Sequence, residues 1–490
     1  MHYEVVIGLE AHAHLATRTK LFCGCSTAFG APPNSQTCPV CTAQPGVLPV
    51  MNRQAFRYAL QTALALNCRI ARHTVLDRKN YYYPDLPKNY QISQLYNNLG
   101  TGGFVDIEVD GRPRRVGIHN VHLEEDAGKL VHPEDAQSWF PQGGGEQLAG
   151  MTLVDLNRAG IPLIEIVTEP DMRSVEEARV YMETLACILR TLGVSECKME
   201  EGDLRFEASI SLREPGAEEY GSRVEIKNLN SMKAVVQALQ YEVRRQADAL
   251  DNGEKVGRDT RLWDEAAGRT APMREKELAH DYRYFPEPDL VPVDIDEAWL
   301  EEARAAIPEL PLARKRRFIE DLGLPDYDAG ILVEDRALAD YFEECVRQGI
   351  EPKTASNWLL VTVLRELNAR SISVAELAVG PGELCELIRF VEDGTIAQNT
   401  GKEVFAEMAE SGKTAAEIVE AKGLRQISDA EQLETLVRQV LQDNPKAVAD
   451  LRGGKKKAQG FLMGQVMRAT KGKANPEVVA QLIATLLQEG

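Results

Sequence analysis

Two pairs of cysteines near the start of the chain have the spacing of a metal site. Cys23 and Cys25 are separated by one residue, and after twelve further residues Cys38 and Cys41 are separated by two. Four thiolates at short paired spacing suit tetrahedral Zn²⁺. Redox chemistry at the second pair is the alternative, but a redox pair normally precedes a helix. We therefore expect a structural zinc knuckle over residues 23–41.

A second group combines carboxylates with imidazoles. Glu10, His12 and His14 alternate directly after the first predicted strand, so they share one face if the chain stays extended there. A carboxylate beside imidazoles suits a divalent metal ion or proton transfer, and the alternative is a solvated strand end. Residues 124–126 are three consecutive carboxylates, which repel one another unless water or a cation such as Mg²⁺ separates them. This run predicts either a magnesium site or a surface turn.

Residues 77–91 hold four tyrosines, two lysines and two prolines. The prolines argue against a regular element, so we expect a loop. Its tyrosines could stack on a base and its lysines could hold a phosphate, or the tyrosines could simply pack on a sheet. The sequence has neither a GxxxxGK[ST] loop nor a GxGxxG turn that opens a helix, which argues against a P-loop or Rossmann nucleotide site.

The elements that position these groups mix strands with helices. Strands are predicted over residues 3–9, 104–109, 112–118, 205–212 and 223–227. The second and third of these form a hairpin whose two turn residues are Asp110 and Gly111. Ser174 and Glu177 predict a capping box for a helix that ends at Gly193, and another helix covers residues 232–250. No repeating β–α–β pattern occurs, so we expect an α+β domain with a mixed or antiparallel sheet.

The proline-rich segment 286–292 marks a boundary, beyond which the pattern is helical to the end of the sequence. We expect an α+β domain over residues 1–292 and two all-α domains over 293–407 and 408–490. A polar stretch at 132–149 looks like an insertion.

Composition bounds the remaining possibilities. Of 490 residues, 44% are apolar, which is enough for several cores, and the formal net charge of −19 argues on average against a nucleic acid or membrane partner. Residues 451–473 reverse that sign, with seven lysines and arginines and no carboxylate. No apolar run is long enough for a membrane span, and no secretory leader is visible. Nine cysteines without a leader fit a reducing cytosol, so we expect a cytoplasmic protein.

Many blocks, read in order, resemble the B subunit of the bacterial and archaeal tRNA-dependent amidotransferase. The matching blocks are VIGLEAHAHL, DRKNYYYPDLPKNYQISQ, HLEEDAGK, DLNRAGIPLIEIVTEPD, KMEEGDLR, EIKNLNS, DYRYFPEPDLVP and GFLMGQVMRATKGKANP. They are spread over nearly the whole chain, and together they are far more specific than any one of them.

The resemblance implies a function for each predicted domain. Residues 1–292 would be a catalytic cradle that uses ATP and Mg²⁺ to phosphorylate the side-chain carboxylate of Glu or Asp on a misacylated tRNA(Gln) or tRNA(Asn). Ammonia then displaces the phosphate, because an acyl phosphate has a good leaving group and a carboxylate does not. A separate A subunit would hydrolyse glutamine to supply the ammonia, and a small C subunit would brace the pair. Residues 293–407 would be a helical domain and 408–490 a tRNA-binding tail.

The resemblance also carries over to single positions. It implies that Glu10, His12, Glu125 and Glu225 bind Mg²⁺, and that Lys79, Glu124 and Glu207 take part in catalysis. Glu207 stands where the family usually has aspartate, and His14 stands where glutamine or glutamate is common, so we do not expect His14 to be a ligand. The tRNA-binding residues would be Arg452, Lys455, Lys456, Lys457, Arg468, Lys471 and Lys473.

Two other interpretations stay open. One is a non-catalytic subunit that only binds tRNA or acts as a scaffold, and the other is a zinc-dependent hydrolase that uses His12 and His14. Four intact carboxylates favour catalysis: Glu10, Glu124, Glu125 and Glu225. The remaining cysteines are expected in apolar cores: Cys68, Cys187, Cys197, Cys345 and Cys385. A second, smaller basic patch is formed by Arg314, Lys315, Arg316 and Arg317.

Overall fold

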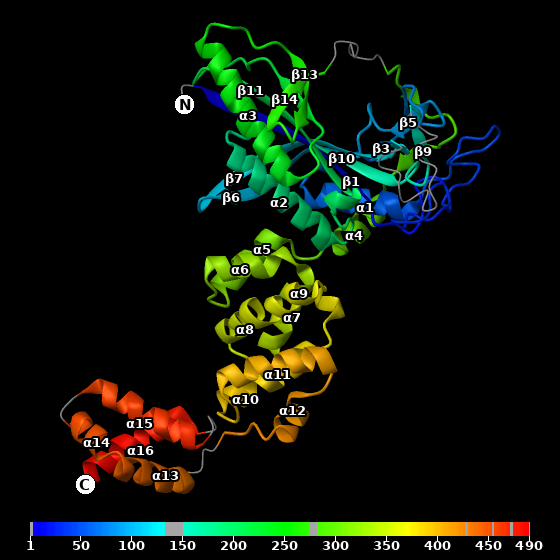
Figure 1. Cartoon of the computed structure of the whole chain (residues 1–490). Helices are drawn as coiled ribbons and strands as arrows, with labels where there is room; N and C mark the ends of the chain where they lie inside the picture. Colours follow the sequence, from blue (N-terminus) through cyan, green and yellow to red (C-terminus); the bar gives the residue numbers. More distant parts are fainter. Residues whose placement is uncertain are drawn as a thin grey trace. The chain divides into compact units, whose positions relative to one another are not determined.

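The computed structural model describes residues 3–132, 150–273, 282–426, 430–452, 455–470 and 474–489. The chain divides into two compact units, Met1–Ala313 and Arg314–Gly490. The first combines helices with a mixed sheet and the second is helical, which confirms the predicted fold class (Figure 1). The predicted insertion at 132–149 lies, except for its first residue, outside the described residues.

A nine-stranded sheet organises the first unit. Its order is β14 (Arg269–Pro272), β13 (Asp259–Asp264), β12 (Val224–Lys227), β11 (Leu204–Arg213), β1 (Glu4–His14), β10 (Pro162–Thr168), β7 (Arg112–Glu125), β6 (Gly100–Val109) and β2 (Arg69–Ile70). Within this sheet β12 and β13 pair in parallel, and the other neighbours are antiparallel. The predicted hairpin is β6–β7 with Asp110 and Gly111 between the strands, so this prediction is confirmed.

Period-two alternation gives the sheet one apolar and one polar face. On β1, Leu9, Ala11 and Ala13 are buried, whereas Glu10 and His12 alternate with them. The apolar face packs against α1 (Arg53–Ala65), α2 (Val175–Leu192) and α3 (Met232–Asp251), which together with the sheet form one core (Figure 1). The polar face of β1 and its neighbours is therefore the side on which the candidate chemistry is gathered.

The start of α2 corrects one detail of the sequence prediction. The Ser174 side chain accepts a hydrogen bond from the backbone N–H of Glu177, as a cap should. The Glu177 carboxylate accepts from the N–H of Arg173 and not from that of Ser174, so the reciprocal capping box is not formed. The helix ends, as predicted, at Gly193, whose φ of 68° lies in the left-handed region that favours glycine.

Short strands correct the expectation that residues 77–91 form only a loop. β4 (Asp77–Asn80) and β5 (Tyr90–Ser93) pair antiparallel, and β15 (Phe285–Pro286) adds to β4. The prolines of the segment lie in the connection between the strands, where no ladder hydrogen bond is required. Two further pairs complete the short elements: β3 (His73–Thr74) with β16 (Val293–Asp294), and β8 (Lys129–Val131) with β9 (Leu153–Asp155).

Residues just after the proline-rich segment pack on the first unit. β16 pairs there, and α4 (Glu297–Ala305) places the Trp299 ring 5.1 Å from that of Phe56 on α1. A 3-10 turn, η3 (Met199–Glu201), precedes β11.

The second unit contains two apolar cores. One is formed by α5 (Pro311–Glu320), α6 (Asp326–Glu334), α7 (Arg336–Arg347), α8 (Pro352–Trp358), α9 (Leu364–Arg370), α10 (Pro381–Glu392), α11 (Gln398–Ser411) and α12 (Ala415–Ala421). The other is formed mainly by α13 (Ala430–Asp443), α15 (Lys456–Ala469) and α16 (Pro476–Glu489), with α14 (Pro445–Arg452) beside them. A π-helical turn, η4 (Leu359–Val363), joins α8 to α9, and η5 (Val374–Glu376) is a 3-10 turn.

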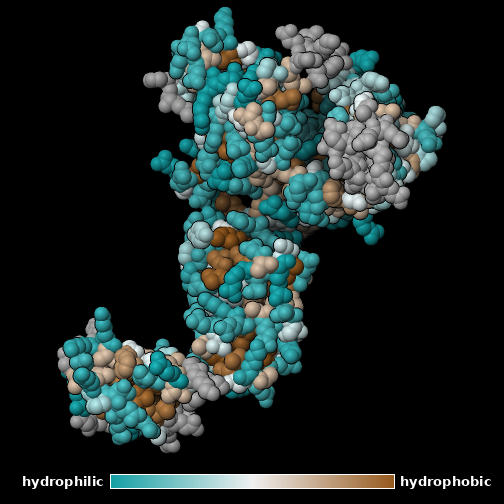
Figure 2. Space-filling model, in the orientation of Figure 1, coloured by the Kyte–Doolittle hydropathy of each residue, from teal (hydrophilic) through white to brown (hydrophobic). Residues whose placement is uncertain are grey.

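Figure 2 shows hydrophobic residues gathered in patches over α5–α6 and over α10–α11, on the visible face of the second unit. Tyr327 on α6, whose residue surface is 74% exposed, is one exposed apolar residue of this unit. Among the helices that the structure describes, none is long and apolar enough to cross a membrane.

Candidate active site

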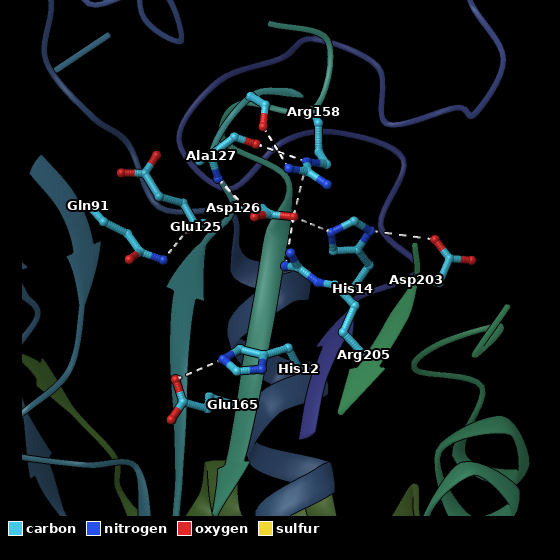
Figure 3. Close-up of polar contacts among 11 residues, drawn as sticks. His12, His14, Gln91, Glu125, Asp126, Ala127, Arg158, Glu165, Asp203 and Arg205 are labelled. Carbon is cyan, nitrogen blue, oxygen red and sulfur yellow. Dashed lines mark hydrogen bonds and ion pairs between the residues drawn. The ribbon is translucent and has the colours of Figure 1, made fainter. Parts of the chain in front are cut away.

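Three neighbouring strands bring imidazoles and carboxylates together on the polar face of the sheet. His12 on β1 is paired with Glu165 on β10, and Glu165 is paired with His122 on β7. The Nε2 atoms of His12 and His122 lie 3.2 Å and 3.4 Å from Glu165 Oε2 (Figure 3 shows the first contact). Glu124 shares the face of His122 two residues along β7. His12, Glu124 and Glu165 each offer a ligand atom, all within 4.8 Å of one another, and we call them the carboxylate–imidazole cluster.

The charges of this cluster are strongly coupled. Burial acts to lower the pKa of His12, but the hydrogen bond to Glu165 and the charges of Glu165 and Glu124 outweigh it and raise the pKa to about 9. Burial acts to raise the pKa of Glu165, but the imidazoles of His122 and His12 hold it well below the ordinary value. Without a bound cation, the histidines therefore supply the positive charge that these carboxylates need.

Lys79 on β4 adds a cation to the same region. Its Nζ lies 5.2 Å from the centroid of the Tyr282 ring. Burial opposes its charge, but the nearby carboxylates Glu124 and Glu165 raise its pKa above the ordinary value. Lys79 thus places an ammonium group beside the carboxylate–imidazole cluster.

A row of carboxylates crosses the adjacent strands. Glu10 on β1 is paired with Glu207 on β11, and Glu225 on β12 lies beyond it. Lys227 contacts Glu207 at 3.3 Å and Glu225 at 3.2 Å. Burial, together with the charges of Glu165 and Glu207, raises the pKa of Glu10 to about 6. A divalent cation would relieve this repulsion, since oxygen ligands are its preferred partners.

Glu125 has different surroundings from Glu124. Its carboxylate contacts Lys88 Nζ and accepts a hydrogen bond from the backbone N–H of Ile92 at 3.0 Å, while its backbone oxygen accepts from Gln91 Nε2 at 2.7 Å (Figure 3). Glu125 and Lys88 line a cavity of about 220 Å³, with Cys41 in the same wall. Adjacent residues of a strand point to opposite sides, which explains why the two glutamates are separated.

The four predicted zinc ligands lie together. One Sγ from each of Cys23, Cys25, Cys38 and Cys41 lies within 4.8 Å of the others, so a possible four-cysteine metal cluster is present. Hydrogen bonding to Cys23, then the backbone of Cys38 and the charge of buried Lys20, lower the pKa of Cys41 to about 4 against the effect of burial. A thiolate is the form that binds metal. The other five cysteines are buried, as predicted.

Asp126 is the centre of another cluster of charged side chains. Its Oδ2 accepts from His14 Nε2 at 2.7 Å and from Arg205 Nη2 at 3.1 Å, and it lies 3.4 Å from Arg158 Nε (Figure 3). His14 Nδ1 lies 3.5 Å from Asp203. Although burial acts to raise the pKa of Asp126, the two arginines and His14 hold it well below the ordinary value. His14 is thus engaged with carboxylates other than those of the carboxylate–imidazole cluster.

The basic residues of the second unit divide into two kinds. The tail residues whose side chains are described are all exposed: Arg452, Lys455, Lys457 and Arg468. Lys455 contacts Asp450 at 2.8 Å. The side chain of Lys456, and all of Lys471 and Lys473, lie outside the described residues. In the patch at 314–317, three of the four cations contact carboxylates, Arg314 being buried against Asp340 and Glu343, so this run is largely neutralised within the fold.

Several members of these clusters were not predicted from the sequence. Glu165 and His122 extend the carboxylate–imidazole site, Lys88 pairs with Glu125, and Arg158 and Arg205 contact Asp126. One signal was available: Glu165 is the one charged residue in the otherwise mainly apolar sequence of β10, where burial requires a partner.

Comparisons with known proteins agree with this architecture. A family model described as the GatB/GatE catalytic domain matches residues 5–301, and one described as the GatB domain matches residues 340–487. The chain is 54% identical over 483 residues to the B subunit of the aspartyl/glutamyl-tRNA(Asn/Gln) amidotransferase of Moorella thermoacetica, covering 99% of both chains. It is 51% identical over 492 residues to the corresponding protein from Caldicellulosiruptor saccharolyticus, covering 100% of both, and 51% over 485 residues to that of Brevibacillus brevis, covering 99% of both.

Proposed function

Because the chain belongs to the family of the tRNA-dependent amidotransferase B subunits, we propose that it is the subunit that activates the tRNA-bound carboxylate in a ligase-type complex. In this proposal the complex amidates Glu-tRNA(Gln), Asp-tRNA(Asn) or both. ATP phosphorylates the side-chain carboxylate of the aminoacyl group, and ammonia then displaces phosphate to give the amide.

The observation that carries the proposal is the chemistry of the polar face of the sheet. Phosphoryl transfer requires positioning and neutralisation of charge more than a protein nucleophile. Acidic ligands and two imidazoles supply these properties on three adjacent strands, centred on His12, Glu124 and Glu165. The half-buried Lys79 adds a positive charge from the separate strand β4. Lys79, whose pKa is raised, is suited to holding a phosphate oxygen.

The donors present fit a divalent cation. The carboxylate–imidazole cluster offers two oxygens and one nitrogen within 4.8 Å, and Glu10, Glu207 and Glu225 add carboxylates on neighbouring strands. A bound Mg²⁺ would neutralise phosphate charge at this site. Of the ligands expected from the family, His12 is supported by this geometry, and Glu10 and Glu225 lie on adjacent strands. We propose instead that Glu125 orients groups around the neighbouring cavity, because its carboxylate already contacts Lys88 and accepts a hydrogen bond from the N–H of Ile92.

The remaining family-based assignments extend this proposal. We assign Zn²⁺ to the four cysteines, where it would brace the knuckle over residues 23–41 without entering the reaction. Residues 1–292 would be the catalytic cradle, 293–407 the helical domain and 408–490 the tRNA-binding tail. The A subunit would supply ammonia from glutamine and the C subunit would brace the pair, in the cytoplasm. The exposed cations of the tail support a contact with the phosphate backbone.

The test is an amidation assay of the co-expressed complex with each misacylated tRNA, ATP, Mg²⁺ and glutamine. We expect amide formation that requires ATP, and loss of it in Glu124→Ala although tRNA still binds. Glu169→Ala, which removes an exposed carboxylate of the same region, serves as the control and should retain activity. Full amidation by Glu124→Ala would remove the carboxylate–imidazole cluster from the reaction.

A purely tRNA-binding or scaffold subunit is the second candidate, favoured only by the exposed basic tail. It predicts that substitutions at His12, Glu124 and Glu165 leave amidation unchanged. A zinc-dependent hydrolase is the third. It fails if removing zinc leaves amidation intact while removing Mg²⁺ stops it.

A further inference from the structure

Two arginines and a histidine gather around the carboxylate of Asp126. One buried oxygen, Asp126 Oδ2, contacts His14 and both arginines. The two guanidinium groups are always charged. Asp203, the second carboxylate, contacts His14 from the other side of the ring. A single shared oxygen thus holds two full positive charges next to each other.

Several donors of this arginine pair, Arg158 and Arg205, have no acceptor among the described residues. Arg158 donates to the backbone oxygens of Ala127 at 3.1 Å and Gly128 at 2.6 Å, which fixes its plane. Arg205 donates through Nη2 to Asp126, whereas its buried Nε has no partner in the described part of the chain. A guanidinium has five N–H donors, so several remain available on each side chain. A buried donor without a partner costs free energy, and a bound acceptor would remove that cost.

The arginine pair faces open space. Both side chains line a groove of about 1460 Å³, with 30% of the Arg158 side chain and 39% of the Arg205 side chain exposed. Arg18 and Lys129 also line this groove, together with six carboxylates: Asp155, Glu196, Glu200, Glu201, Asp203 and Glu207. Arg158 and Arg205 differ from the other two cations in that Asp126 Oδ2 contacts both of them and holds them side by side. Two fixed, planar donors that converge next to a groove are the arrangement with which proteins bind phosphate in a bidentate manner.

From this geometry we propose that Arg158 and Arg205 bind a phosphate group of the substrate in this groove, and that Asp126 and His14 are positioning residues for them. The proposal rests on the proposed function, because it needs a phosphate-bearing substrate. That phosphate belongs either to ATP or to the RNA near its aminoacylated end. The two sources share the same chemistry and are separated below by the arms of the experiment.

Binding is measured with the co-expressed complex carrying Arg158→Gln, Arg205→Gln or both. One arm titrates ATP with Mg²⁺ in the absence of RNA, and the other titrates unacylated tRNA in the absence of nucleotide. Loss of a charge-assisted hydrogen bond weakens binding on the order of tenfold or more, so the double variant should show at least that loss in one arm. The arm that changes identifies the source: ATP in the first, RNA in the second.

Arg18→Gln is the matched control, because it removes an exposed arginine from the lining of the same groove. It should leave both affinities within about twofold of the wild type, since an exposed charge without fixed geometry contributes little. The proposal is overturned if the double variant binds both ligands like the wild type, or if Arg18→Gln weakens binding as much. If the wild-type complex bound neither ligand, the proposed function itself would fail, which is a different result.

The positioning role has its own readout. Asp126→Asn should raise KM for the ligand identified above while changing kcat much less, although both arginines are intact. Because this variant could fail to fold, His14→Gln provides a milder change that keeps a donor for Asp126, and it should raise the same KM by a smaller factor. Arg158→Lys and Arg205→Lys keep the positive charge but lose the planar guanidinium. Each should therefore retain part of the ligand affinity that the corresponding glutamine variant loses. A fall in kcat alone in Asp126→Asn and His14→Gln would contradict the positioning role.

Discussion

Replacing Glu165 with glutamine should chiefly affect the protonation of His12, by lowering its pKa. In the wild type, free of divalent cations, the pKa of His12 is about 9 against an ordinary value of 6.5. At about 1.4 kcal/mol for each tenfold change in affinity for the proton, the interaction of the imidazolium with its carboxylates exceeds the cost of burial by about 3 kcal/mol. The hydrogen bond to Glu165 and the charge of Glu165 are the two interactions that favour the imidazolium most.

Glu165→Gln removes both of these interactions with a carboxylate and leaves two opposing effects: burial, which lowers the pKa of His12, and the charge of Glu124, which raises it. We expect the pKa of His12 to fall from about 9 toward its ordinary value of 6.5. Titration of the histidine ring signals by NMR measures this directly, with the His12→Gln spectrum as the assignment. Glu169→Gln is the matched control, because Glu169 lies at the end of the same segment and contacts the exposed His119 at 2.9 Å. It should leave the pKa of His12 unchanged.

Glu165→Gln should also change how the free energy of unfolding depends on pH. A histidine whose pKa is raised on folding adds stability that is fully present below the unfolded value of about 6.5 and is lost as the pH rises through about 9. The difference in free energy of unfolding between wild type and Glu165→Gln should therefore be larger at about pH 6 than at about pH 9.5, by roughly 3 kcal/mol. An unchanged pKa of His12, or a stability difference that does not depend on pH, would refute this account of the cluster.

Three further predictions concern the other sites. Protein purified without chelator should contain about one equivalent of zinc, which is lost when Cys38 and Cys41 are both replaced by serine; elemental analysis decides this, and a zinc-free wild type contradicts it. Because the pKa of Glu10 is about 6, affinity for Mn²⁺ as a probe of the cation site should rise between about pH 5 and 7, and Glu10→Gln should flatten that rise. Lys457→Gln should lower the slope of log affinity for tRNA against log salt by about 1, and Lys455→Gln by less because Asp450 already pairs with it; equal or absent changes would argue against a backbone contact.

The sequence was most informative where the relevant spacing is local. Cys23, Cys25, Cys38 and Cys41 could be grouped because short paired spacing leaves few other arrangements, and they do lie together. The face shared by Glu10 and His12 followed from the period of a strand. The hairpin at Asp110 and Gly111 was likewise a matter of turn chemistry, and β6 and β7 confirm it.

Features that depend on strand pairing were beyond the sequence. The partner of His12 is Glu165 because β1 and β10 pair in one register, which nothing within either segment specifies. The short strands β4 and β5 were missed because the prolines between them dominate the local pattern. The run of cations at 314–317 resembled a binding patch, but Asp340 and Glu343 on α7 neutralise much of it through the fold.

Trapping of the activated intermediate tests the central claim most directly. The complex is incubated with misacylated tRNA, ATP and Mg²⁺, without glutamine and with hydroxylamine, which attacks acyl phosphates in place of ammonia. The account predicts a side-chain hydroxamate on the tRNA-bound residue, formed together with ADP, absent without ATP and absent in Glu124→Ala. Amidation from glutamine that proceeds at full rate while no hydroxamate and no ADP are formed would contradict it.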